Sequence, residues 1–110
     1  MQNHNTLKML PESERPYEKY LAHGEQALSD AELLAIILKT GTKQLTSIDV
    51  ARNLLSGNQG NLLNLYKLSY EELLAFEGIG KVKAIQLKAI AELSRRISKT
   101  SSAFSLKNTF

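Results

Sequence analysis

The chain has 110 residues, of which 43% are hydrophobic and 23% are charged. This length suits one domain and is too short for two domains with separate cores, and the composition is that of a globular protein. The longest apolar run, Leu33–Leu38, has six residues, far below the roughly 20 that cross a bilayer. No secretory signal is recognisable at the start, and the lack of cysteine excludes disulfides, Cys-based zinc sites and thiol catalysis. We therefore expect a cytoplasmic protein.

The charge is distributed unevenly along the chain. Residues 1–66 carry six basic and seven acidic side chains, whereas residues 78–110 carry seven basic side chains against Glu92 alone. Such an asymmetry indicates an anionic partner, usually nucleic acid or an acidic membrane surface. A solvated helix followed by a basic linker explains the same pattern, and the charge alone does not decide between the two.

The first elements in chain order are a leader and a short helix. Residues 1–10 are polar and aperiodic, which predicts a flexible leader before a helical domain over residues 11–97. The short helix is expected to open at Arg15-Pro16-Tyr17, because proline is tolerated in a first helical turn, and Gly24 is able to end it.

The next predicted helix covers Asp30–Lys39. Ser29 and Glu32 have the spacing of a capping box, in which a serine oxygen and a carboxylate accept hydrogen bonds from free backbone amides. This helix is apolar on all sides, so we expect it to be buried on all sides at the centre of the domain. A further amphipathic helix is predicted over Ser47–Ser56, with Gly57 as its terminator.

The second half of the chain repeats this pattern. The capping-box spacing returns at Ser69 and Glu72, 40 residues after the first copy, and each copy leads into a leucine-rich helix, a glycine-bearing turn and a second helix. The last helix is predicted from Lys81 to about Ile97, followed by a linker over the serine- and threonine-rich residues 98–110. No segment alternates with period two, so the predicted class is all-α, a compact bundle of about six short helices with a degenerate internal repeat.

The segment Gly78-Ile79-Gly80 is the most informative part of the sequence. Two glycines permit positive φ angles and close approach of the backbone to a bulky partner, and the isoleucine between them can plug into the core. Gly80 stands at the start of the last helix, where free amides and the positive end of the helix dipole bind anions. Lys81 and Lys83 place ammonium groups beside those amides. We expect a phosphate clamp whose fold depends on Gly80 if that residue has a positive φ; the alternative is a tight helical corner without a ligand.

The last helix carries a basic stripe and an apolar arc. Lys88 and Arg95 follow Lys81 at seven-residue intervals and therefore lie on one side of the helix. This stripe extends the phosphate path from the hairpin, although a solvated helix face explains it equally well. The opposite arc is predicted to be the core face and contains six apolar residues: Val82, Ile85, Ala89, Ile90, Leu93 and Ile97.

The glycine segment and its flanking helices resemble the helix-hairpin-helix DNA-binding motif. In that family the hairpin amides bind phosphates of one strand without reading bases, and in some members the hairpin carbonyls hold a monovalent cation. The resemblance implies DNA contacts at five positions: Gly78, Ile79, Gly80, Lys81 and Lys83. The usual proline before the first glycine is Glu77 here, which places a carboxylate near the phosphate path.

A wider stretch, about Pro11–Ile97, is similar to the amino-terminal region of the bacterial RadC family of DNA repair proteins. The similarity rests on the hairpin and on two preceding segments, Glu14-Arg15-Pro16-x-Glu18-Lys19-x-Leu21 and Ala27-Leu28-Ser29-Asp30-Ala31-Glu32-Leu33-Leu34-Ala35-Ile36-x-Leu38-x-Thr40-Gly41-Thr42. Full-length family members continue through a linker into a JAB/MPN-type metallopeptidase-like domain with a zinc site. The resemblance therefore implies an isolated amino-terminal half.

The sequence shows no catalytic or metal-binding constellation. The two histidines, His4 and His23, are 19 residues apart, and the two aspartates, Asp30 and Asp49, both precede the hairpin. We expect no enzymatic activity in this chain, no bound metal and no cofactor beyond a monovalent cation at the hairpin. The expected partner is DNA, bound through its phosphates. We do not expect binding to a membrane. The rival class is an interaction module that docks its own carboxy-terminal domain or a repair protein.

Overall fold

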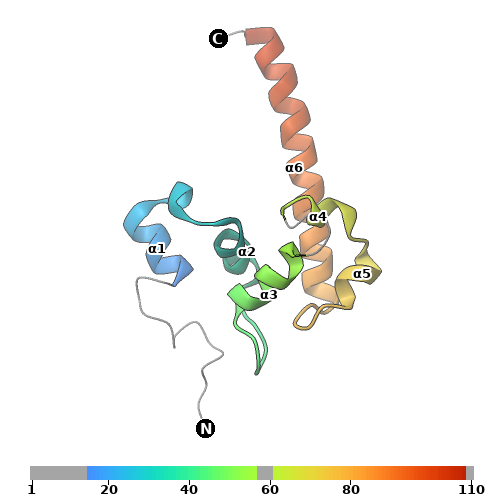
Figure 1. The fold of residues 1–110 in the computed structure, drawn as a ribbon. Coiled ribbons are helices and arrows are strands. Elements are labelled where there is room, and N and C mark those ends of the chain that lie inside the picture. The colour runs from blue at the N-terminus through green and yellow to red at the C-terminus, as the bar shows by residue number, and fades with distance from the viewer. Residues whose placement is uncertain (1–14, 57–60, 109–110) are drawn as a thin grey trace.

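A computed structural model of the chain describes residues 15–56 and 61–108, with side chains up to Ser101 (Figure 1). The predicted leader over residues 1–10 and the terminator Gly57 lie outside these ranges. The described residues form no strand, which confirms the all-α prediction. They form six α-helices and one 3₁₀ turn: α1 (Pro16–His23), η3 (Glu25–Ala27), α2 (Asp30–Leu38), α3 (Ser47–Leu55), α4 (Asn64–Lys67), α5 (Tyr70–Leu74) and α6 (Lys81–Asn108).

Capping boxes begin three of these helices. The two predicted from sequence are confirmed at the starts of α2 and α5, and a third, formed by Thr46 and Asp49, begins α3. In each box the cap oxygen accepts a hydrogen bond from a first-turn amide, and the carboxylate accepts one from the cap amide. The long helix α6 differs, because the residue before it is Gly80, which has no side chain, and its first turn contains no acidic residue.

The core lies between α2 and α3 and continues to α4, α5 and the first half of α6. On α2 the side chains of Leu34, Ala35 and Leu38 are buried, whereas Leu33 and Ile37 are each 38% exposed. The prediction that α2 is buried on all sides is therefore wrong. Its outer side borders an open cleft, because α3 and α1 cover only part of its circumference.

The helix α6 is longer than predicted. The sequence placed its end near Ile97, but the helix continues to Asn108 and extends away from the other helices (Figure 1). The segment predicted to be a linker is thus helical up to residue 108. Serine and threonine lower helix propensity only slightly, so an established helix can propagate through them.

The buried face of α6 is not the one predicted. Ala84, Leu87 and Ala91 face the core with 0–4% exposure. Of the six residues predicted for the core face, Ile90 is half-buried and the other five are exposed. The helix therefore has two apolar faces, and the one with two alanines is packed, because small side chains let α4 and α5 approach closely.

Candidate nucleic-acid interface

The hairpin is the turn between α5 and α6, and its central residue fixes it to the core. The side chain of Ile79 is 5% exposed and belongs to the core cluster. Its amide donates to the carbonyl of Phe76 at 3.1 Å. The predicted role of Ile79 as a plug is confirmed, so a partner on this surface meets the hairpin backbone and not the isoleucine side chain.

The two glycines of the hairpin have different roles. Gly78 has φ +92°, and a Cβ added there would lie 2.9 Å from Cγ2 of Val50 and 3.3 Å from Cγ2 of Thr42. Both the backbone conformation and the packing therefore require glycine at this position. Gly80 is exposed and lies outside the positive-φ region, and an added Cβ would meet no atom within 4 Å.

The condition under which the fold would depend on Gly80, a positive φ at that residue, is therefore not met. The chain reverses its direction at Gly78, and by Gly80 the backbone has already entered the start of α6, where its carbonyl accepts the first helical hydrogen bond from Ala84. The fold gives no internal reason for glycine at residue 80. What the missing side chain provides is open space above the backbone, next to the free amides of the first helical turn.

Lys81 is the exposed cation at this helix start. Within the described part of the chain its ammonium group makes no hydrogen bond or ion pair. Free amides, the positive end of the dipole of a 28-residue helix and an unpaired ammonium group thus occur together. Such an arrangement can bind an anion such as a phosphate.

The Lys83 side chain reaches from α6 to the loop between α2 and α3. Its Nζ donates to the carbonyl oxygen of Thr40 at 2.7 Å and to Oγ1 of the same residue at 3.1 Å. Burial lowers the pKa of the Lys83 ammonium. The side chain therefore ties the start of α6 to the loop between α2 and α3, and the sequence prediction assigned it only to phosphate binding.

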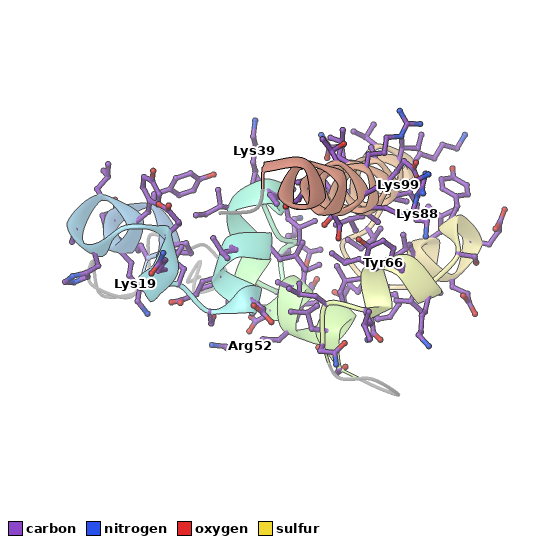
Figure 2. The ribbon with its side chains drawn as sticks, turned by 90° about the horizontal axis from the view of Figure 1, so that it is seen from above. Lys19, Lys39, Arg52, Tyr66, Lys88 and Lys99 are labelled. Atoms are coloured by element: carbon purple, nitrogen blue, oxygen red, sulfur yellow. The ribbon has the colours of Figure 1, made fainter. Side chains whose placement is uncertain are left out.

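Lys88 and Arg95, the other two predicted cations, also have partners inside the protein. The Nζ of Lys88 donates to three carbonyls at the end of α4, those of Leu65, Tyr66 and Leu68, at 2.9–3.2 Å. Figure 2, which views the molecule from above, labels Lys88 near Tyr66 on one side of α6. Arg95 forms an ion pair with Glu92, with Nη2 and Oε2 2.8 Å apart. The basic stripe predicted from seven-residue spacing is thus largely engaged in internal contacts.

Glu92 also accepts a hydrogen bond from Arg96. The hydrogen bonds from Arg95 and Arg96 lower the pKa of the exposed Glu92 carboxyl to about 2. The carboxylate therefore stays charged at neutral pH and neutralises part of the basic charge in this section of α6.

The loop between α2 and α3 lies against the hairpin. This contact was not predicted from the sequence. Oγ1 of Thr42 donates to Oε2 of Glu77 at 3.5 Å, so the carboxylate that replaces the usual proline contacts this loop. The loop also carries two exposed lysines, Lys39 and Lys43. Figure 2 shows the Lys39 side chain pointing away from the helices. The 40-residue internal repeat was the only sequence signal that relates the loop between α2 and α3 to the hairpin between α5 and α6.

Lys39 has a strained backbone. Its φ is 71° and its ψ is −52°, and the amide of Thr40 donates to the carbonyl of Leu38 at 2.8 Å. These values describe a γ-turn of the rare, strained kind. The turn ends α2 abruptly and directs the lysine outward.

Among the residues described, no group of three or more histidine, aspartate or glutamate side chains is placed to hold a metal ion. Likewise, no described helix is long and apolar enough to cross a membrane.

Comparison with known proteins identifies the family. Residues 7–85 match the family model described as UPF0758 N-terminal. The chain is similar to the UPF0758 proteins of Moorella thermoacetica (52% identity over 104 residues, 94% of this chain and 43% of the relative) and Dechloromonas aromatica (55% over 86 residues, 78% and 38%). That of Alkaliphilus oremlandii is 50% identical over 95 residues, 86% of this chain and 41% of the relative.

The chain thus spans about two fifths of the length of these curated relatives. No solved structure matches it significantly. The match over most of the chain confirms the resemblance seen in the sequence: the chain belongs to the UPF0758 family, and it carries the amino-terminal region of this RadC-type family.

Proposed function

We propose that this domain binds DNA through backbone phosphates at the hairpin Gly78–Lys81, without preference for sequence. The observation that carries the proposal is the exposed Gly80 at the uncapped start of α6. The fold does not require glycine there, and the open space exposes the first-turn amides beside Lys81. A phosphate oxygen can approach these amides as closely as the cap hydroxyl oxygens approach the first-turn amides of α2, α3 and α5, which is 3.0–3.1 Å.

The chemistry of the hairpin supports phosphate contacts over base contacts. Amides fix the geometry of a bound phosphate, whereas Lys81 contributes charge and the release of counterions. Glycine and the buried Ile79 offer no side chain that could read a base edge. Lys39 and Lys43 add positive charge on the adjacent loop. Within this proposal Lys83 and Lys88 position the hairpin and the helices around it.

The proposed role is binding, with no catalytic step in this domain. The proposed binding requires no cofactor, and the helix-hairpin-helix resemblance implies at most a monovalent cation at the hairpin carbonyls. The link to DNA repair rests on the RadC resemblance, and the cytoplasmic location rests on the lack of cysteine; both belong to this proposal.

The proposal can be tested by giving α6 an internal cap. In Gly80→Asp a carboxylate occupies the place of the phosphate and binds the same amides. Aspartate is as good a cap residue as glycine or better, so the free energy of unfolding should stay the same or rise by a few tenths of a kcal/mol. Affinity for fluorescent duplex, forked and gapped DNA, measured by anisotropy, should fall by roughly tenfold or more on all three.

The matched control is Gln26→Glu, which makes the same one-unit negative change in net charge at an exposed residue of η3. This variant should keep most of the wild-type affinity. Wild-type affinity in Gly80→Asp, or an equal loss in both variants, would contradict binding at the hairpin amides.

The rival function, an interaction module, is favoured by a separate observation. Five residues predicted for the core are exposed along the outer face of α6.

A further inference from the structure

We infer that the outer face of α6 is a docking surface for an acidic amphipathic helix of a partner protein. This inference does not depend on DNA binding at the hairpin. The surface, called the outer stripe below, consists of five residues: Val82, Ile85, Ala89, Leu93 and Ile97.

The outer stripe is continuous and strongly exposed. Its members are three or four residues apart, so they lie on one face of the helix. The four large side chains are 58–70% exposed, and Ala89 between them is exposed as well. Single exposed apolar residues are normal on a protein surface, but a row of them marks an interaction site. The row covers 15 residue steps, or about 22 Å of helix, which matches a partner helix of about four turns.

An apolar cleft adjoins the outer stripe. It has a volume of about 180 Å³ and lies between α2, α4 and α6. Leu33 and Ile37 of α2 line one side of it and Ile90 of α6 the other. Ile90 lies two turns before Ile97 on almost the same line of the helix, so the cleft opens beside the stripe. A large side chain of a partner helix can insert there as an anchor.

The charges beside the outer stripe select the partner. Lys81, Arg96 and Lys99 are exposed along one edge of it. Glu92, on the same edge, is already paired with Arg95 and Arg96. A helix with carboxylates along its matching edge is attracted to this surface, whereas a second copy of the chain would bring like charges together. Charge complementarity therefore favours an acidic partner helix over self-association.

The test uses a synthetic 18-residue peptide with leucines at helical i, i+3, i+4 and i+7 spacing and glutamates along both edges. Its matched control has lysines in place of the glutamates. In ¹H–¹⁵N spectra of the chain without DNA, the glutamate peptide should shift the amide signals of the outer stripe and of the cleft. The lysine peptide should bind at least about tenfold more weakly.

Variants locate the binding site. Ile85→Ser and Leu93→Ser should each weaken binding of the glutamate peptide by about tenfold, because each removes one large apolar contact. Both residues are exposed, so the fold should be retained. Leu21→Ser on α1 is the control, since Leu21 is 81% exposed but distant in sequence from the stripe.

Four outcomes would overturn the inference. Both peptides could bind equally, or neither could bind at millimolar concentration. Sedimentation could show a dimer that Leu93→Ser abolishes, which would assign the stripe to a second copy. Vesicles of phosphatidylglycerol and phosphatidylcholine could bind the stripe more tightly than the peptide, which would assign it to a membrane. The readout uses neither DNA nor Gly80. The docking inference can therefore fail while the DNA proposal holds, and the DNA proposal can fail while the docking inference holds.

Discussion

Replacing Gly78 with alanine should strongly destabilise the domain. A φ of +92° is unfavourable for a residue with a Cβ, at a cost of about 1–2 kcal/mol. The added Cβ would also lie 2.9 Å from Cγ2 of Val50, which has 0% exposure and cannot move without repacking the core. Such overpacking costs a further ~1–3 kcal/mol. Gly78→Ala should therefore lower the free energy of unfolding by about 2–5 kcal/mol, a large part of the ~5–15 kcal/mol typical of a domain.

The matched control is Gly80→Ala, two residues away in the same hairpin. Gly80 has no positive φ, and its added Cβ meets no atom within 4 Å. The expected loss is below about 1 kcal/mol, the cost of a poorer residue at a helix start. Urea denaturation followed by circular dichroism measures both values. If the two variants were equally stable, or if Gly80→Ala were the less stable, the geometry described for the hairpin would be refuted.

Three further predictions concern the core, an internal lysine and pH. Leu34→Ala should cost about 2–5 kcal/mol in urea denaturation, because Leu34 is 2% exposed, whereas Ile37→Ala should cost clearly less, because Ile37 is 38% exposed. Lys88→Met should cost about 1–3 kcal/mol in the same assay, since it leaves three carbonyls at the end of α4 without their ammonium donor; an unchanged midpoint would contradict this role. Burial raises the pKa of Glu32, but hydrogen bonds from the capping-box amide and from Lys19 outweigh burial and hold it below its ordinary 4.5. The stability that the Glu32 carboxylate contributes is thus complete above about pH 4.5 and is lost as the pH falls through the lowered pKa. Between about pH 5 and pH 3, the free energy of unfolding should therefore fall less in Glu32→Gln than in the wild type.

Local signals in the sequence predicted much of the fold. The capping boxes of α2 and α5 were recognisable because their partners are only three residues apart. Ile79 was recognised as a plug because it is the one apolar side chain between two glycines in the turn. The positive φ, however, belongs to Gly78 alone, and the sequence could not distinguish two glycines in one turn.

Contacts between distant residues were the part that could not be predicted. Lys83 finds its acceptor at Thr40, 43 residues earlier, and Lys88 finds three carbonyls 20–23 residues earlier. Seven-residue spacing shows which residues share a side of α6 but not what packs against that side. The same limit explains the wrong core face: α6 has two apolar faces, and the choice depends on how closely α4 and α5 can approach Ala84 and Ala91.

The salt dependence of DNA binding tests the central claim most directly. Affinity for a duplex should be measured between ~50 and ~200 mM salt for the wild type, for Lys81→Gln and for the control Lys67→Gln, an exposed lysine on α4. The account predicts that wild-type affinity falls with salt for every DNA sequence tried. In Lys81→Gln the slope of log K against log salt should be smaller by about 0.9, one phosphate contact, and in Lys67→Gln it should be unchanged. A wild-type affinity that is independent of salt, or a slope that Lys81→Gln leaves unchanged, would contradict phosphate binding at this hairpin.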